Sequence, residues 1–154
     1  MAKKRVPQKL RQLVRERAQG CCEYCVCPDS HATQEHSQDH ITPEELGGKT
    51  TADNLALACQ GCNNAKYIKT EAIDPVSRVK VPLFHPRRDV WHEHFAWSED
   101  SLFLIGLTPT GRATIEALRL NRLGIINLRR ALTIEGKHPP SHRSVTAFDD
   151  PVLR

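Results

Sequence analysis

Hydrophobic positions near the start of the chain recur at the spacing of an α-helix. Within residues 7–20 the apolar side chains are Leu10, Leu13, Val14 and Ala18. Spacings of three and four residues place such side chains on one side of a helix. Pro7 and Gly20 are the residue types that commonly flank a helix at its start and just past its end. The pattern predicts a helix with one buried stripe and one basic face.

Shorter patterns follow between residues 36 and 69. We expect a strand over residues 36–42, a turn-rich loop through the "PEELGGKTT" segment, and a second strand that starts at Asn54 or Leu55 and ends at Ala58. The segment "CNNAKYIKT" then opens a helix. The order strand, loop, strand, helix predicts an α+β fold.

The second half of the chain has a looser pattern. Apolar density in "SLFLIGL" predicts a further strand. Thr108 and Pro109 are typical of an N-cap followed by the first helical position, so a helix should run to about Asn121. Its inward positions should be Ile115, Leu118 and the 120–123 region. We expect a last helix over 125–132 and a flexible tail over 136–154, where periodicity is lost.

Six cysteines bring metal chemistry into the picture. Two Cys-x-x-Cys pairs, Cys22 with Cys25 and Cys59 with Cys62, have the spacing that closes a tetrahedral zinc site. Cys21 and Cys27 are then surplus, either as thiols outside the site or as alternative ligands. His31 and His36 are the other possible substitutes. Three disulfides in a secreted structural protein are the competing interpretation.

Length and charge narrow the class of protein. The 154 residues suit about one domain. No apolar run has the length of a membrane span, and no apolar stretch follows the basic N-terminus, so we expect a cytoplasmic protein without a membrane partner. The net charge is only +4, but positive residues gather at Lys3, Lys4, Arg5, Lys9, Arg11, Arg15 and Arg17. Such a block attracts a polyanion by counterion release, and it also fits a solvated helix face.

Three segments together resemble the HNH endonuclease family. They are "RERAQGCCEYC", "DHITPEELGG" and "TTADNLALACQGCNNAK", in the order and spacing of that family. The resemblance implies a small ββα-metal core with a structural zinc, over about residues 7–70. The segments "PLFHPRRDVWHEHFAW" and "GLTPTGRATIEALRLN" look like a C-terminal strand and helix extension of one bacterial subset, over about 71–135. Residues 1–135 would then form a single nuclease domain.

The resemblance also implies a role for four residues. His40 would be the general base, Asp39 and Asn63 would hold a divalent catalytic ion, and Asn54 would brace the loop that carries the histidine. A neutral imidazole can accept a proton from water at pH 7. Oxygen ligands suit Mg²⁺ or Mn²⁺, whereas four thiolates suit zinc. The partner would be DNA, expected to be double-stranded.

Each of these residues also has a simpler interpretation. Asp39 can pair with His40, His40 can be a packed histidine, Asn54 a turn residue and Asn63 a helix N-cap. Lys66 can contact phosphate or stay solvated.

Polar residues of the extension have two interpretations as well. Arg87 and Arg88 can grip the DNA backbone or form surface ion pairs. The histidines His85, His92 and His94 lie among aromatic residues and lack the spacing of a zinc protease helix, so we expect them to pack onto the core.

Two functions therefore remain in competition. The first is a metal-dependent DNA endonuclease. The alternative is a non-catalytic zinc-ribbon protein that binds nucleic acid, which the basic helix favours but which has no need of Asp39, His40 and Asn63 together. The sequence does not predict an oligomeric state.

Overall fold

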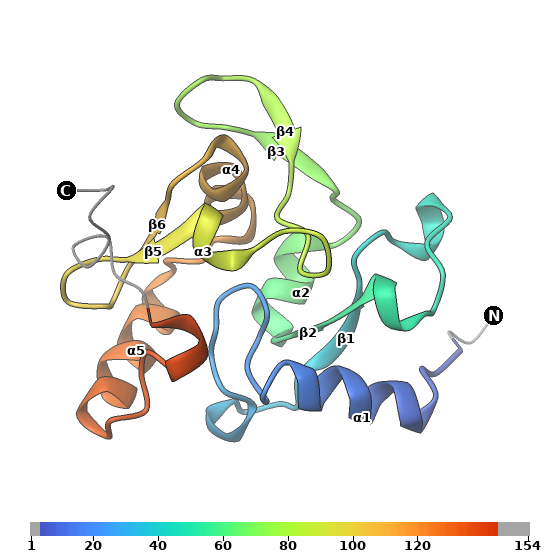
Figure 1. The fold of residues 1–154 in the computed structure, drawn as a ribbon, viewed down its shortest axis with the longest axis horizontal. Helices are drawn as coiled ribbons and strands as arrows, with labels where there is room; N and C mark the ends of the chain where they lie inside the picture. Colours follow the sequence, from blue (N-terminus) through green and yellow to red (C-terminus); the bar gives the residue numbers. More distant parts are fainter. Residues whose placement is uncertain (1–3, 145–154) are drawn as a thin grey trace. The chain divides into compact units, whose positions relative to one another are not determined.

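The chain divides into two compact units, with the boundary between Ile68 and Lys69. The computed structural model describes residues 4–144, so Lys3 and the part of the expected tail from residue 145 onward lie outside the described residues. Figure 1 shows the order of the elements along the chain. None of the helices within 4–144 is long and apolar enough to cross a membrane.

The first unit is built on one antiparallel hairpin and two helices (Figure 1). Its elements are α1 (Gln8–Arg17), β1 (Ser37–His40), β2 (Leu55–Ala58) and α2 (Gln60–Lys66), with single 3₁₀ turns at Asp29–His31, Glu44–Leu46 and Ala52–Asn54. In the hairpin, Ser37 lies opposite Ala58 and His40 lies opposite Leu55. The expected order of strand, loop, strand and helix is therefore confirmed, with a first strand shorter than 36–42.

The core of this unit lies between α1 and β2. Val14 and Ala18 of the α1 segment form one buried cluster with Leu55 and Leu57. Burying a leucine side chain contributes about 1.5–3 kcal/mol, so this cluster attaches α1 to β2. Leu13 was expected in the same stripe, but it is 42% exposed. It lies one residue, and hence about 100° around the helix, from Val14.

The second unit combines two hairpins with two longer helices. Its elements are β3 (Glu71–Ile73), β4 (Lys80–Pro82), α3 (Trp91–His94), β5 (Phe95–Trp97), β6 (Leu104–Gly106), α4 (Pro109–Leu118) and α5 (Leu123–Ile134), with a 3₁₀ turn at Ser141–Arg143. β3 pairs with β4 and β5 pairs with β6, both antiparallel. The patterns of the sequence predicted β6 and the two helices, and they missed β3, β4, β5 and α3.

The start of α4 follows its sequence signal closely. Thr108 is the N-cap, and its hydroxyl accepts a hydrogen bond from the Gly111 amide at 3.0 Å. The helix ends at Leu118 rather than near Asn121, because Arg119 adopts a left-handed conformation with φ 52°. Leu118 and Leu120 are buried as expected.

One expected inward position of this region is wrong. Leu123 begins α5 and is 75% exposed, so the buried stretch ends before it.

Aromatic side chains fill the interior of the second unit. Trp91 lies 5.5 Å from Phe95 and 5.9 Å from Trp97, measured between ring centroids. The buried Arg129 guanidinium lies 5.0 Å from the Trp97 ring and donates to the carbonyls of Leu102 and Leu120. Cation–π attraction and the hydrogen bonds of its two terminal nitrogens make this buried charge tolerable.

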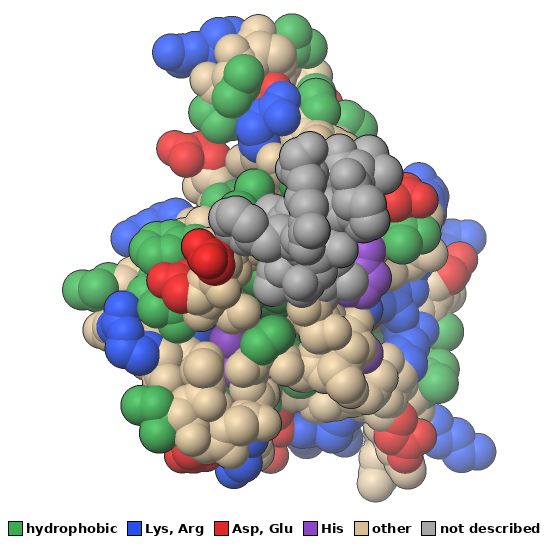
Figure 2. Space-filling view, turned by 60° about the vertical axis from the view of Figure 1, so that its left-hand side comes forward, with side chains coloured by type: hydrophobic (Ala, Val, Ile, Leu, Met, Phe, Trp, Pro, Cys, Tyr) green, Lys and Arg blue, Asp and Glu red, His purple; other side chains and the backbone are tan. Residues whose placement is uncertain are grey.

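Surface charge is mixed over the face drawn in Figure 2. Lys and Arg side chains are spread over that face, with Asp and Glu side chains among them.

A buried carboxylate ties α4 to the β3–β4 hairpin. Both oxygens of Asp74 accept hydrogen bonds from Arg112, from Nε and Nη2, each at 2.9 Å. The backbone amides of Val76 and Ser77 donate to the same carboxylate. The Arg112 guanidinium holds the pKa of Asp74 well below its usual range.

We predict that Asp74→Asn makes the second unit less stable at pH 7 and removes part of its acid sensitivity. Because the folded-state pKa of Asp74 is lowered, the ion pair stabilises the fold above about pH 4, and this contribution disappears as the pH falls through the folded-state pKa. Urea unfolding from pH 3 to 7, followed by tryptophan fluorescence, reports on this unit because both tryptophans lie in it. The exposed Glu116→Gln is the control, and equal pH profiles of Asp74→Asn and wild type would contradict the prediction.

Candidate active site and metal centre

Four cysteine sulfurs converge in the first unit. The Sγ atoms of Cys22, Cys25, Cys59 and Cys62 all lie within 4.8 Å of one another, and all four residues are buried. Cys25 Sγ and Cys59 Sγ are 3.6 Å apart. Four Zn–S bonds of 2.3 Å in a tetrahedron require sulfurs about 3.8 Å apart, so the arrangement fits zinc. In the part of the chain that the structure describes, this is the one group of three or more His, Cys, Asp or Glu side chains close enough to share an ion.

In each Cys-x-x-Cys pair, the backbone amide of the second cysteine donates a hydrogen bond to the sulfur of the first. The amide of Cys25 donates to Cys22 Sγ at 3.5 Å, and the amide of Cys62 donates to Cys59 Sγ at 3.4 Å. Cys59 is also the N-cap of α2, so the second pair includes the first turn of that helix. Burial raises the pKa of the Cys22 thiol, so a thiolate at this position needs a nearby cation.

The surplus cysteines and the substitute histidines lie outside this group. None of the six cysteines is in a disulfide. His36 is buried, and its Nε2 lies 2.9 Å from the Cys27 carbonyl oxygen while its amide donates to Asp29. The predicted register of the four ligands is therefore the one that the structure adopts.

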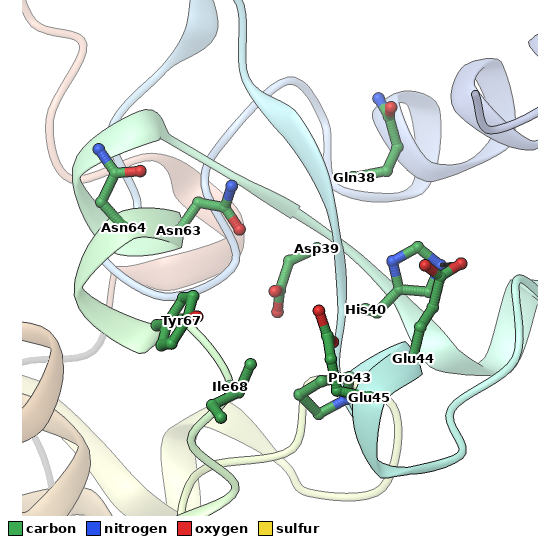
Figure 3. Close-up of a pocket in the computed structure, with 10 residues that line it drawn as sticks. All are labelled: Gln38, Asp39, His40, Pro43, Glu44, Glu45, Asn63, Asn64, Tyr67 and Ile68. Atoms are coloured by element: carbon green, nitrogen blue, oxygen red, sulfur yellow. Dashed lines mark ion pairs between the residues drawn. The ribbon is translucent and has the colours of Figure 1, made fainter. Parts of the chain in front are cut away.

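A pocket of about 240 Å³ brings three of the four predicted site residues together. It lies between the end of β1 and α2, and Asp39, His40 and Asn63 all line it (Figure 3). The other lining residues are Gln38, Pro43, Glu44, Glu45, Asn64, Tyr67 and Ile68. In Figure 3 the Asp39 and His40 side chains extend to opposite sides of β1, with Asp39 on the side of α2. This follows from the alternation of side chains along a strand.

His40 is held by a short chain of hydrogen bonds. Its Nε2 lies 2.9 Å from Thr50 Oγ1 and 3.4 Å from Glu44 Oε1, and its side chain is only 10% exposed. The Thr50 hydroxyl donates to Glu44, so it accepts from the imidazole. Nε2 then carries the ring proton, which leaves Nδ1 as the nitrogen that can accept a proton.

Asp39 has partners that the sequence did not indicate. Tyr24 donates its hydroxyl to Asp39 Oδ2 at 2.8 Å, and Lys66 Nζ lies 3.1 Å from the same oxygen. Burial raises the pKa of the Asp39 carboxyl, although the charge of Lys66 acts in the opposite direction. The alternative in which Asp39 pairs with His40 is wrong, because the ion pair is with Lys66.

Lys66 is directed into the protein rather than outward. It is 1% exposed, and its Nζ also donates to the carbonyl oxygens of His40 and Ile41 at 3.2 and 3.0 Å. Neither a solvated lysine nor a phosphate contact fits this burial. The residue instead links the last turn of α2 to the end of β1.

Asn54 lies outside the pocket and braces the loop behind it. Its Oδ1 accepts from the Thr42 amide at 2.9 Å, and its Nδ2 donates to the carbonyls of Thr42 and Lys49 at 3.0 and 2.8 Å. Gly48 is packed so closely here that a Cβ atom would lie 1.7 Å from the Thr42 oxygen. These are the contacts that the predicted bracing role requires, and they exceed those of a simple turn residue.

Asn63 follows the last cysteine ligand directly. It lies in the first turns of α2 but is not the N-cap, which is Cys59, so that alternative is wrong. Among the described residues its side-chain amide makes no hydrogen bond, and Figure 3 shows it on the α2 side of the pocket, across from Asp39. One carboxylate and one amide oxygen are donors of the kind that Mg²⁺ or Mn²⁺ takes together with water. The donor types fit a divalent ion, although Lys66 already neutralises one of them.

For several residues that line the pocket, the sequence contained only a weak indication, or none, that they would belong to the site. Glu44 and Glu45 lie in the glycine-containing loop, where acidic residues are unremarkable. Tyr67 is 72% exposed at the pocket and has φ 50°, a conformation rare for a residue with a side chain. Only the backbone of the structure reveals this strain.

The role of the arginines of the second unit stays a prediction. Arg88 is exposed and Arg87 is half-buried. His94 Nδ1 lies 2.6 Å from Thr108 Oγ1, and Phe84 packs edge-on against the His94 ring. α3 has four residues, too few to hold the i, i+4 histidine pair of a zinc protease helix.

Comparison with known proteins agrees with the geometry of the first unit. Residues 22–69 match the family model described as HNH endonuclease. No curated protein and no solved structure matches the chain. The matched segment holds all four clustered cysteines and every residue that lines the pocket. Residues 22–69 of the chain are therefore similar to the HNH endonuclease family.

Proposed function

We propose that the protein is a metal-dependent endonuclease that hydrolyses phosphodiester bonds of double-stranded DNA. An HNH domain already indicates a nuclease-type or nucleic-acid-binding function. The observation that carries the finer proposal is the shared pocket of Asp39, His40 and Asn63. A protein that only binds nucleic acid has no need of a base, a carboxylate and an amide around one cavity.

His40 is the general base in this proposal. Its Nδ1 removes a proton from the attacking water, while Thr50 and Glu44 hold the ring through Nε2. The Glu44 carboxylate beside Nε2 stabilises the imidazolium that forms. A base in place removes the need for free hydroxide, which the phosphodiester charge repels.

Asp39 and Asn63 would hold a Mg²⁺ or Mn²⁺ ion. When bound, the ion offsets the negative charge that develops on the leaving oxygen. Asn63 is fixed in position by Cys62, its neighbour and a zinc ligand in this proposal. The structural zinc thus restrains the amide within the small tolerance that such chemistry requires.

We predict that His40→Ala lowers the rate of DNA cleavage by at least about a hundredfold, because general-base catalysis contributes about 10²–10⁴-fold. Conversion of supercoiled plasmid to nicked and linear forms, with Mg²⁺ or Mn²⁺ and with a chelator, measures the rate. His31→Ala is the matched control, since His31 does not line the pocket. Zinc-loaded wild type that leaves plasmid, linear and single-stranded DNA intact with every ion would refute the enzymatic proposal.

A second candidate function, binding without cleavage, is favoured by one observation. The Asp39 carboxylate, which is expected to hold the catalytic ion, already forms an ion pair with the buried ammonium group of Lys66. A protein that binds without cleaving needs no ion at Asp39, so this pair fits it directly.

The ion pair can be tested by mutation. Removing Lys66 alone leaves the Asp39 charge unpaired in the interior, which costs about 3–5 kcal/mol in comparable cases. Removing both charges avoids that cost.

We therefore predict that Lys66→Met destabilises the first unit and that Asp39→Asn/Lys66→Met restores much of the loss. A double-mutant cycle of unfolding free energies, followed by far-UV circular dichroism, measures the coupling between the two residues. If the protein is a nuclease, the stable double variant binds duplex DNA like wild type but no longer cleaves it. Cleavage at the wild-type rate by the double variant would exclude Asp39 as an ion ligand.

We predict one zinc ion per chain, lost in Cys62→Ala together with much of the helical signal of the first unit. Removal of one thiolate opens the tetrahedral site, and the small hairpin then lacks its metal closure. Elemental analysis and circular dichroism measure both effects. Cys21→Ala is the matched control, because Cys21 is buried nearby but lies outside the sulfur group. Full zinc content in Cys62→Ala would contradict the assignment.

A further inference from the structure

A second cavity of about 740 Å³ lies beside α1 in the first unit. One wall is a face of the N-terminal segment and α1, formed by Arg5, Gln8, Arg11, Gln12 and Arg15. The four helical residues follow the spacing of three and four residues that places side chains on one face. This face is adjacent to the buried stripe of α1 rather than part of it.

The rest of the lining of this cavity carries amide side chains from β1, the segment before it and the first residue of α2. Gln34, Gln38 and Gln60 line it, together with Glu35. Gln60 is fixed in place, because its Nε2 donates to the Glu35 carbonyl at 2.9 Å and to Ser37 Oγ at 2.7 Å. We call this cavity the α1 groove.

The charge of the α1 groove is positive. Arg5 and Arg11 line it without an ion pair to any described carboxylate, whereas Arg15 pairs with Asp29. Glu35 is the one acidic side chain among its lining residues. The arginines supply positive charge, and the side-chain amides of Gln34 and Gln38 supply hydrogen-bond donors, which is the chemistry that holds a phosphate backbone.

The α1 groove adjoins the candidate active site at Gln38. This residue lines both cavities. Gln38 and His40 are two residues apart on β1, and Figure 3 shows their side chains on the same side of the strand. Two residues of a strand span roughly 7 Å, so the groove approaches the proposed base along β1.

We propose that the α1 groove binds the phosphate backbone of the DNA strand that enters the pocket, a surface assignment that rests on the proposed nuclease function. Arg5 and Arg11 each contact a phosphate, and the glutamine side chains orient the strand toward His40. The occupant is therefore a nucleic-acid strand, held mainly by charge. Attraction of this kind depends on salt in a predictable way.

Full-length zinc-loaded protein carrying His40→Ala allows binding to be measured without cleavage. The affinity for a fluorescent duplex DNA is determined by anisotropy at salt concentrations from roughly 50 to 200 mM. Arg5→Gln and Arg11→Gln should each reduce the steepness of log affinity against log salt by about 0.9, and together by about 1.8. Lys9→Gln is the matched control, because it removes one positive charge from α1, the helix of Arg11, at a position outside the groove. Its plot of log affinity against log salt should lose less steepness than those of the two arginine variants.

The outcomes separate this proposal from the proposed function. If Lys9→Gln reduces the slope as much as Arg5→Gln, the attraction is diffuse and the groove assignment is overturned, even where wild type cleaves plasmid. If Arg5→Gln and Arg11→Gln reduce the salt dependence of DNA binding as expected but wild type never cleaves DNA, the groove stands as a binding surface. The nuclease proposal then fails. Circular dichroism and zinc content identify any variant that does not fold, and Arg5→Gln, whose side chain is exposed, remains the decisive one.

Discussion

The first unit depends on one constraint, the convergence of four cysteine sulfurs from two distant points of the chain. A two-stranded hairpin with strands of four residues is at best marginally stable in water. The Cys22–Cys25 pair and the Cys59–Cys62 pair are far apart in sequence, yet their Sγ atoms lie within 4.8 Å of one another. An ion shared by these four sulfurs would fix α2 at the end of the hairpin.

The position of α2 in turn determines what faces the end of β1. Cys62, Asn63 and Lys66 are neighbours on this helix, and each has a different task. Cys62 belongs to the sulfur group, Asn63 lines the pocket, and Lys66 reaches Asp39 and two carbonyls of the β1 segment. Asn63 and Lys66 can both face the end of β1, because residues three apart lie on one side of a helix.

Sequence patterns predicted the features that are local and missed those that depend on long-range partners. The cysteine spacing, the Thr108 N-cap and the burial of Val14 all follow from a few neighbouring residues. The burial of Lys66 could not be predicted in this way, because it depends on Asp39, which is 27 residues earlier in the chain. The brace formed by Asn54 was expected only from the family resemblance, since its partners lie across the loop.

The two cavities of the first unit, the candidate active-site pocket and the α1 groove, have opposite charge, and this difference bears on the proposed mechanism. Asp39, Glu44 and Glu45 line the pocket, and one ammonium, Lys66, offsets only one of these carboxylates. A phosphodiester that enters this pocket is repelled unless a cation accompanies it, since like charges at close range in a partly buried site interact strongly. The α1 groove is positive instead. In the proposed function, attraction of DNA and hydrolysis of its backbone are therefore assigned to adjacent surfaces, and the proposed hydrolysis would require a divalent ion in the pocket.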